Sequence, residues 1–274
     1  MQMQLSTKSY RHGGYKHFTV HDSKKREIAV AAVYDRVIHR LLYDYLLPKW
    51  NESFIFDAWS CRPGKGLHAA VARAHKYMEL YPRAWVWRAD ITKFFDTIDQ
   101  AVLLEALKRK VESPDALWLI ESVLSSYYKN EVGRGMPIGN LTSQIFANIY
   151  LNEFDRYMVH MLKPTAYLRY GDDWLCFAGS KNEIEAIREK AIVFLAETLK
   201  LKVNPKLNHV QPAYKGVTFL GVDIWSNGLR ITSQTQARIR LKINNRNYAS
   251  YEALVRQFSN EHGIKKFYWQ TLDI

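Results

Sequence analysis

The spacing of hydrophobic positions switches several times along the chain between a helical and an alternating pattern, which predicts mixed helices and strands. Residues 85–91, WVWRADI, alternate as in a strand that carries Asp90 near its end, opposite the Trp face. Residues 166–178, AYLRYGDDWLCFA, read as two short strands around a Gly-Asp-Asp turn, and the apolar segment 216–224, GVTFLGVDI, reads as one strand. Residues 15–32 predict a hairpin with the basic tip HDSKK.

Helical spacing places Val37, Leu41 and Tyr45 on one face of a helix that stops at Pro48. Helix starts are predicted at Asp99, at Ser113 and at Thr142 or Ser143. Another helix spans 184–199, and roughly the last 45 residues are helical and basic. A strand, helices, a hairpin, a helix and a strand in this order indicate a split βαβ sheet with helices on one face.

The composition is that of a globular protein with a polyanionic partner. The chain has 274 residues, 47% of them hydrophobic, and a net charge of +12. Because no basic amphipathic helix stands alone, nucleic acid is favoured over a lipid surface. Cys61 and Cys176 lie far apart without ligand spacing, which favours a reducing compartment over structural zinc. Neither a signal sequence nor a membrane span is indicated, so we expect a cytoplasmic protein with no membrane partner.

The adjacent carboxylates Asp172 and Asp173 are the main candidate for chemistry. Turns commonly contain Asp, so this pair alone also fits an ordinary turn. If the strand carrying Asp90 lies beside the hairpin, however, three mutually repulsive carboxylates meet at one edge of the sheet. Oxygen ligands of this kind suit Mg²⁺, and two such ions can assist an in-line phosphoryl displacement.

Several motifs, in their order and spacing, resemble the palm of reverse transcriptases. They are ADITKFFDTID, GMPIGNLTSQIFANIYLN, RYGDDWLCF, NPKL and FLGVDI, and the resemblance covers roughly residues 24–225. It implies an α+β right-hand polymerase fold with a ferredoxin-like palm. The expected parts are fingers at 1–84, a palm at 85–228 with finger insertions around 105–140, and a short helical thumb at 229–274.

The resemblance also implies roles for individual residues. Two Mg²⁺ ions, for which Mn²⁺ can substitute, would be held by Asp90, Asp172, Asp173 and the carbonyl of Ile91. Phe95 would exclude a ribose 2′-hydroxyl, and Lys206 would protonate the leaving pyrophosphate. The remaining deoxynucleotide-binding candidates are Ile138, Gly139, Gln144, Arg26, Arg62 and Lys65, and the primer grip would be Phe219, Leu220 and Gly221.

Each of these roles has a simpler alternative. Phe95 and Ile138 can be core residues, and Lys206 can lie in a solvated turn. Arg62 and Lys65 can contact template phosphates instead, or belong to a solvated loop. The C-terminal basic residues can be an ordinary solvated helix face.

One departure refines the resemblance. Ile138 stands where most reverse transcriptases have a glutamine, and Gln144 where they have a proline. The pattern is similar to that of reverse transcriptases from diversity-generating retroelements, which copy a template-repeat RNA with misincorporation opposite adenine and use a small oligomeric accessory protein. The expected partners are therefore that RNA, the RNA/cDNA duplex, deoxynucleotides and the accessory protein. The alternatives are a retron-like or group II intron-like enzyme of ordinary fidelity and a non-catalytic RNA-binding scaffold.

Overall fold

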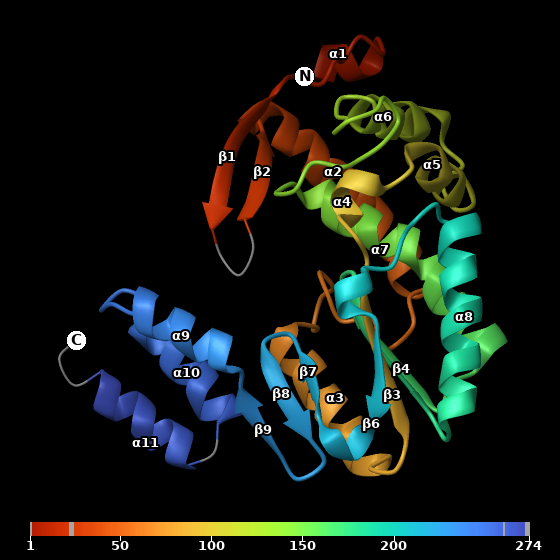
Figure 1. Cartoon of the computed structure of the whole chain (residues 1–274). Coiled ribbons are helices and arrows are strands. Elements are labelled where there is room, and N and C mark those ends of the chain that lie inside the picture. Colours follow the sequence, from red (N-terminus) through yellow and green to blue (C-terminus); the bar gives the residue numbers. More distant parts are fainter. Residues whose placement is uncertain (1, 22–24, 260, 272–274) are drawn as a thin grey trace.

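The strand predicted at residues 85–91 lies inside the largest sheet of the molecule. In the computed structural model, which describes residues 2–21, 25–259 and 261–271, this sheet is antiparallel with the order β4–β5–β3–β6. Its strands are β3 (Trp85–Asp90), β4 (Ala166–Tyr170), β5 (Asp173–Ala178) and β6 (His209–Pro212). Figure 1 shows the sheet in the lower half of the molecule. Strands that are distant in the sequence thus become neighbours.

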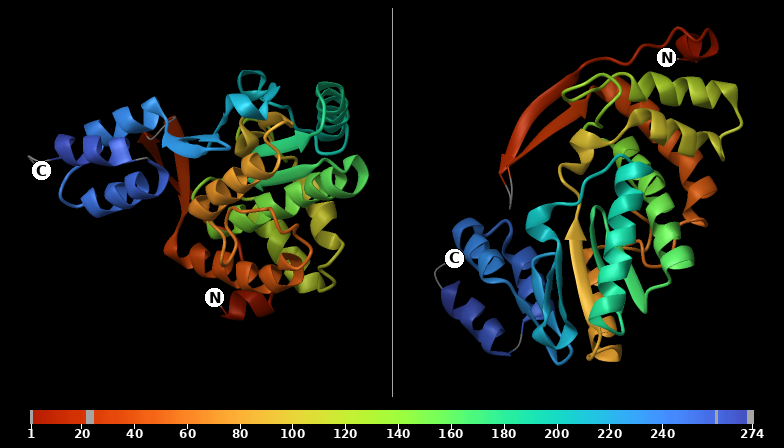
Figure 2. Two further views of the ribbon diagram at one scale, coloured as in Figure 1. Left: turned by 90° about the horizontal axis from the view of Figure 1, so that it is seen from below. Right: turned by 45° about the vertical axis from the view of Figure 1, so that its right-hand side comes forward.

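Helices cover both faces of this sheet, so the prediction of helices on one face was wrong (Figure 2). Trp87 and Trp174 share a buried cluster with residues of α7 (Leu141–Arg156) and α8 (Lys181–Glu197). Val86 and Phe177, on the opposite face, pack with α3 (Leu67–Leu80) and the C-terminal strands. Since both faces of β3 are apolar, leaving either face in water would cost much of the free energy of burial.

The predicted N-terminal hairpin is confirmed as β1 (Tyr15–His21) and β2 (Lys25–Ala31), paired in register from Tyr15↔Ala31. Residues 22–24 of the expected basic tip lie outside the described residues. Figure 1 shows this hairpin at the top of the molecule, near the helical part of the chain. The other elements there are α1 (Gln2–Ser6), α2 (Val33–Asn51), α4 (Phe94–Thr97), α5 (Gln100–Lys108) and α6 (Pro114–Leu124).

Helix α2 differs from its prediction in two ways. It contains Pro48 and continues to Asn51, because a proline near the end of a helix removes only one backbone hydrogen bond. Its buried face is formed by Ile38, Leu42 and Leu46, whereas Val37 and Leu41 are 51% and 50% exposed. The helix has two apolar rows, and packing selected the row that the spacing argument had not used.

The segment 216–224 is not one strand, as predicted, but two. Strands β7 (Val217–Phe219) and β8 (Val222–Trp225) form a tight hairpin and, with β9 (Gly228–Ile231), a separate three-stranded sheet. The turn residues Leu220 and Gly221 have φ values of 51° and 82°, as in a type I′ turn. Beyond the sheet lie α9 (Ser233–Lys242), α10 (Tyr248–Phe258) and α11 (Glu261–Gln270), which confirms the helical C-terminal segment.

The local signals for helix starts were mostly correct. Asp99 accepts hydrogen bonds from the N–H groups of Ala101 and Val102, and Ser113 accepts one from Ala116. Helix α7, however, begins at Leu141 and not at Thr142 or Ser143, because Asn140 takes the N-cap position. Among the described helices, none is long and apolar enough to cross a lipid bilayer.

The expected boundaries after residues 84 and 228 stay predictions. In Figure 1 the helices α9–α11 lie apart from the upper helical part, and the strands β7–β9 lie between these helices and the large sheet. Helix α3 belongs by sequence to the expected fingers at 1–84, yet it packs on the large sheet and on β8.

Candidate active site

The structure brings the three predicted carboxylates to one end of the large sheet. Asp90 is the last residue of β3 and pairs in register with Asp173, the first residue of β5. Asp172 lies in the two-residue turn that joins β4 to β5, after Gly171 with a φ of 64°. A glycine with positive φ at the first central position is typical of a type II′ turn. This turn projects the Asp172 carboxyl beyond the end of the strands.

Asp90 and Asp172 form a closely coupled pair. The side chain of Asp90 is only 6% exposed, and Asp172 is half-buried. Burial, the Asp90 charge and a hydrogen bond between the two carboxyls raise the pKa of Asp172 to about 7. Without a cation, a proton is therefore retained on Asp172 up to near neutral pH, where it can bridge to Asp90. A divalent cation can replace that proton, and a pair of carboxylate oxygen donors is the donor set that Mg²⁺ prefers.

Asp173 is held differently from the other two carboxylates. Its Oδ2 lies 3.0 Å from Nη2 of Arg88, and its Oδ1 lies 3.4 Å from Nε. Within the described residues, no group of three Asp, Glu, His or Cys side chains converges as a metal site. Instead of the expected cluster of three carboxylates, Asp90 and Asp172 lie together, and Asp173 beside them forms an ion pair with Arg88. Sequence reasoning missed Arg88, although its alternation with Asp90 puts both on one face of β3.

The backbone around Ile91 is fixed by the segment that leads to Lys206. The carbonyl of Asp90 accepts a 2.8 Å hydrogen bond from Asn204, and Thr92 donates one of 2.8 Å to Lys202. Because carbonyls alternate along an extended strand, the carbonyl of Ile91 points to the opposite side, toward β5. Lys206 is exposed, and its N–H bonds to the Asn204 side chain at 3.1 Å.

Phe94 and Phe95 differ in burial. Their distance in sequence from Asp90 had assigned the exclusion of the 2′-hydroxyl to Phe95. Phe94 is 2% exposed and packs edge-on against Tyr150, whereas Phe95 is half-buried. The carbonyl of Phe95 accepts a 2.7 Å hydrogen bond from the N–H of Met136. Phe94 is therefore a core residue, and Phe95 lies where the core meets the segment that leads to Ile138.

The segment around Ile138 lies against strand β2. The carbonyl of Ile138 accepts a 2.9 Å hydrogen bond from the N–H of Ala29. The buried side chain of Asn140 accepts one from the N–H of Ala31 at 3.0 Å and donates one to the carbonyl of Ala29 at 2.6 Å. Sequence reasoning missed Asn140, whose type suggests only a helix cap. Its amide instead satisfies backbone groups of β2, and it fixes Ile138 beside the hairpin.

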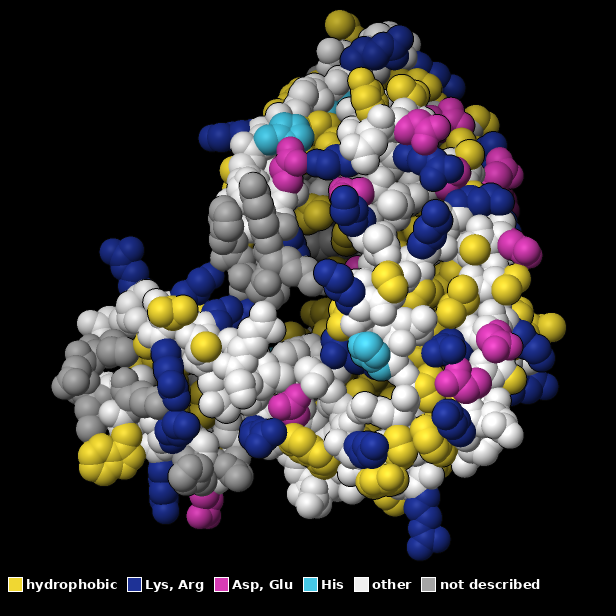
Figure 3. All heavy atoms as spheres, viewed as in Figure 1, with side chains coloured by type: hydrophobic (Ala, Val, Ile, Leu, Met, Phe, Trp, Pro, Cys, Tyr) yellow, Lys and Arg dark blue, Asp and Glu magenta, His cyan; other side chains and the backbone are white. Residues whose placement is uncertain are grey.

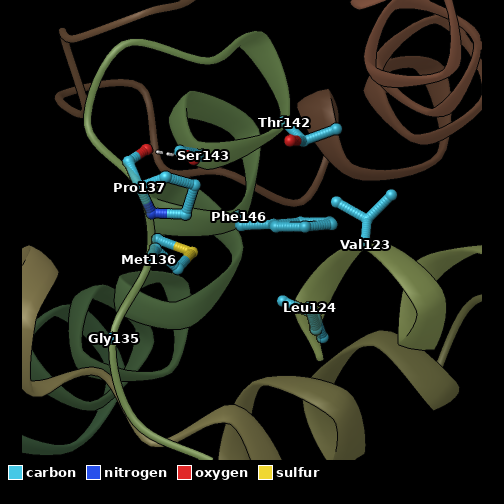
Figure 4. A pocket seen from close by; sticks show the side chains of 8 residues that line it. All are labelled: Val123, Leu124, Gly135, Met136, Pro137, Thr142, Ser143 and Phe146. Atoms are coloured by element: carbon cyan, nitrogen blue, oxygen red, sulfur yellow. Dashed lines mark hydrogen bonds between the residues drawn. The ribbon is translucent and has the colours of Figure 1, made fainter. Parts of the chain in front are cut away.

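Gly139 is required where it stands. Its φ is 110°, and a Cβ built there would lie 2.7 Å from Cγ2 of Ile28. Gln144 is exposed in the first turn of α7. Behind this segment is a small, mostly apolar cavity, into which Phe146 and Met136 point, with Ser143 bonded to the carbonyl of Pro137 at 2.7 Å (Figure 4). It is too small for a nucleotide.

The comparison with protein families agrees with this geometry. The family described as "Reverse transcriptase (RNA-dependent DNA polymerase)" matches residues 16–224, which is well over half of the chain. The chain belongs to the reverse transcriptase family. Asp90, Asp172 and the segment around Ile138 all lie within the matched part.

Curated relatives of this chain include two bacterial proteins. Protein YkfC of Escherichia coli is 26% identical, with 73% of this chain and 63% of that protein covered. The group II intron-encoded protein LtrA of Lactococcus lactis is 22% identical, with 73% and 44% covered. The chain therefore spans less than two thirds of the length of these relatives.

Solved structures confirm the right-hand polymerase fold. A telomerase structure from Candida albicans matches with a TM-score of 0.62 and 13% identity, covering 97% of this chain and 50% of that one. An apo telomerase from Candida tropicalis matches with a TM-score of 0.61 and 14% identity, covering 96% and 57%. At such identities the likeness concerns the fold alone.

Two of the three basic side chains expected at the triphosphate, Arg62 and Lys65, make hydrogen bonds to backbone carbonyls near their own loop. Arg62 donates to the carbonyls of Asn51, Ile55 and Ala58 at 2.7–3.2 Å. Lys65 donates to a carbonyl at 2.8 Å, and its Nζ lies 3.6 and 3.9 Å from the centres of two aromatic rings. Arg26 is exposed on β2. Triphosphate binding by the three stays a prediction, and the contacts of Arg62 and Lys65 give them a structural role.

The residues expected to grip the primer form the β7–β8 turn. Phe219 is fully buried, and Leu220 and Gly221 are the two turn residues. The carbonyl of Gly221 accepts hydrogen bonds of 3.1 Å from the N–H of Thr232 and from Oγ1 of Thr235, at the start of α9. Figure 3 shows a hollow between this C-terminal part and the part with the β1–β2 hairpin, with Lys and Arg side chains on both sides.

Proposed function

We propose that this chain is an RNA-directed DNA polymerase that uses the Asp90–Asp172 pair for nucleotidyl transfer. The observation that carries the proposal is that a buried carboxyl at the end of β3 and a half-buried carboxyl in the β4–β5 turn lie within hydrogen-bond contact of each other. A pair of this kind has little reason to exist in a protein that only binds a polyanion, because it repels the ligand and destabilises the fold.

The residues around the pair would have different roles in the reaction. Asp90, Asp172 and the carbonyl of Ile91 would hold Mg²⁺, for which Mn²⁺ can substitute. When bound, the metal supplies positive charge at the attacking and leaving oxygens. Arg88 holds the Asp173 carboxylate in place next to the pair through an ion pair of 3.0 Å. Lys206, which is exposed near the strand end, would give a proton to the leaving pyrophosphate.

The substrates of this proposal are an RNA template with its growing cDNA and deoxynucleotides. The net charge of +12 and the basic sides of the hollow in Figure 3 suit a nucleic-acid duplex. Half-buried Phe95 lies next to the segment around Ile138, where a ring can exclude a ribose 2′-hydroxyl.

We further propose that the enzyme belongs to a diversity-generating retroelement and copies a template-repeat RNA with errors at adenines. The support is Ile138, an apolar side chain held beside β2 where a polar one would help fix the incoming base. Reducing the energy gap between correct and wrong pairs by about 1.4 kcal/mol gives tenfold more errors. Its partner would be a small oligomeric accessory protein. The likeness to LtrA favours the alternative, a group II intron-like or retron-like enzyme of ordinary fidelity.

One experiment tests the activity and the subtype. The purified chain is given an RNA template with all four bases, a primer, deoxynucleotides and Mg²⁺, with and without the accessory protein, and the cDNA is sequenced. Asp172→Asn is the blank and should make no cDNA while it still binds RNA. Errors concentrated opposite adenine, and fewer of them in Ile138→Gln, would support the retroelement. Faithful cDNA would refute the mutagenic subtype but keep the polymerase.

Absence of cDNA under all these conditions, with RNA binding intact, would refute the proposed activity for the isolated chain. It would favour the non-catalytic RNA-binding scaffold. An Asp172→Asn variant that still synthesises cDNA would instead refute the assigned role of the pair.

A further inference from the structure

We propose that Arg169 is a positioning residue that fixes the turn carrying Asp172. This inference rests on the proposed function, in which Asp172 takes part in nucleotidyl transfer. Arg169 lies in β4, two residues before the turn, and its side chain is 1% exposed.

Arg169 and Ser60 together hold both backbone groups of Gly171. Nη1 of Arg169 donates a 2.8 Å hydrogen bond to the carbonyl of Gly171, the peptide that leads into Asp172. The N–H of Gly171 donates a 2.9 Å hydrogen bond to Oγ of Ser60. These two bonds hold the peptide planes on both sides of Gly171, so the backbone that leads into Asp172 cannot rotate freely and the position of its side chain is restricted.

The guanidinium of Arg169 is itself locked. Nε and Nη2 bond to the two oxygens of Asp155, in α7, at 2.7 and 2.6 Å. Tyr167 donates to the same carboxylate at 2.8 Å, and Asn148 lies 3.4 Å from Nη1. Such a bidentate pair has little freedom, because two parallel hydrogen bonds fix the plane of the guanidinium as well as its position. The long helix α7 thus serves as the rigid support of the turn.

Arg169 acts from behind the site and not within it. It pairs with Trp174 in the register of β4 and β5, so its side chain lies on the face of the sheet that packs against α7. Asp90 and Asp173 pair with each other on the opposite face. Arg169 therefore does not reach the substrate side, and it acts on the chemistry through the turn and through the attraction between its charge and Asp172, which Arg169→Lys keeps.

A purely structural explanation accounts poorly for this arrangement. Replacing a buried ion pair by apolar residues of similar volume often leaves stability unchanged or raises it. The ion pair with Asp155 would be enough to compensate the buried charge of Arg169, yet its remaining nitrogen, Nη1, donates to the carbonyl of Gly171 in the turn. A misplacement of about 1 Å at a reacting group can lower a rate by about a hundredfold, so a fixed turn has a clear catalytic value.

The chain offers a matched control. Arg73 bonds to both oxygens of Asp57 at 2.8 and 3.1 Å, and Tyr77 donates to the same carboxylate at 2.7 Å. This is the same Arg–Asp–Tyr chemistry, but the side chain of Arg73 makes no contact with the turn among the interactions of the described residues. Arg73→Lys therefore reports what the loss of a pair of this chemistry does at a more exposed place, 33% against 1%, whose Asp57 carbonyl also accepts a hydrogen bond from the N–H of Arg169.

The test compares Arg169→Lys, Ser60→Ala and Arg73→Lys in primer extension on RNA. Arg169→Lys keeps the positive charge but loses the paired hydrogen bonds of the guanidinium, and Ser60→Ala removes only the hydroxyl that accepts from the N–H of Gly171. We expect kcat to fall by about 10- to 100-fold in Arg169→Lys and less in Ser60→Ala, with KM for the deoxynucleotide nearly unchanged. Arg73→Lys should keep the wild-type kcat. The single-turnover rate and the amplitude of the first turnover separate slow enzyme from unfolded enzyme.

A second readout does not depend on synthesis. Titration with Mn²⁺, followed by its electron paramagnetic resonance signal, should show weaker binding in Arg169→Lys than in Arg73→Lys. A wild-type kcat in both Arg169→Lys and Ser60→Ala, or only a reduced amplitude with an unchanged rate, would overturn the inference. If the wild type makes no cDNA, the proposed function fails, and Mn²⁺ affinity then decides the inference: equal affinities overturn it.

Discussion

Replacing Asp172 by Asn should make the metal-free protein more stable at pH 8. The reason is that burial and the neighbouring Asp90 raise the pKa of Asp172 from 3.8 to about 7. Because the folded-state pKa lies above the unfolded-state value, the folded protein binds this proton more tightly. The contribution of this group to the free energy of unfolding is therefore greatest below pH 4, falls as the pH rises and levels off above pH 7.

The size of the effect follows from that pKa. At about 1.4 kcal/mol for each tenfold change in proton affinity, the ionised pair costs about 4 kcal/mol at pH 8 and about 2 kcal/mol at pH 5. Water at the half-buried carboxyl screens part of this cost, so we expect Asp172→Asn to gain about 2–4 kcal/mol at pH 8. At pH 5 the gain should be about half as large.

Urea unfolding in EDTA, followed by the fluorescence of the 8 Trp residues, measures both values. Asp173→Asn is the matched control, because Asp173 pairs with Arg88 at 3.0 Å. Its replacement should lower the free energy of unfolding by about 1–3 kcal/mol, the opposite sign. If Asp172→Asn is no more stable than the wild type at pH 8, or gains as much at pH 5, then the pKa of Asp172 is not raised in the folded protein and the reasoning is refuted.

Three further outcomes are expected. Gly139→Ala should lower the free energy of unfolding in urea by about 2 kcal/mol more than Gly133→Ala, because a Cβ at residue 139 would lie 2.7 Å from Ile28. Gly133 also has a positive φ but has open space around it, so equal losses would exclude the close contact. Burial lowers the pKa of His39 to about 4, so the contribution of His39 to the free energy of unfolding should be complete above pH 7 and fall by about 3 kcal/mol toward pH 4. A pH profile that is the same in His39→Gln as in the wild type would contradict this. Phe95→Val should raise ribonucleotide incorporation at least about tenfold in primer extension, whereas an unchanged ratio would assign the exclusion to another side chain.

The sequence was informative wherever a few neighbouring residues decide the outcome. The alternation in 85–91 predicted β3 and the place of Asp90, and the Gly-Asp-Asp turn predicted the β4–β5 hairpin. Asp99 and Ser113 were recognised as caps because a short polar side chain can bond to the backbone two or three residues later. Such signals depend on local geometry, and packing elsewhere did not change them.

Some errors arose where two local patterns were both possible. Val37 and Leu41 lie on one apolar row of α2, and Ile38 and Leu42 lie on another, but only contact with α7 and the other core elements decides which row is buried. The apolar segment 216–224 matched the pattern of a single strand, whereas in the structure the chain turns back at Leu220 and forms two paired strands.

The arrangement of the candidate site was the part that tertiary structure alone decided. By itself, the sequence determined that Asp90, Asp172 and Asp173 occupy strand ends and a turn, because that follows from spacing over a few residues. Which carboxyl has a raised pKa and which one pairs with Arg88 depend on residues up to 85 positions apart, and the direction of Arg169 depends on Asp155 in α7. Their energies come from burial and from charge separation in space, and neither quantity exists until the sheet and α7 have packed together.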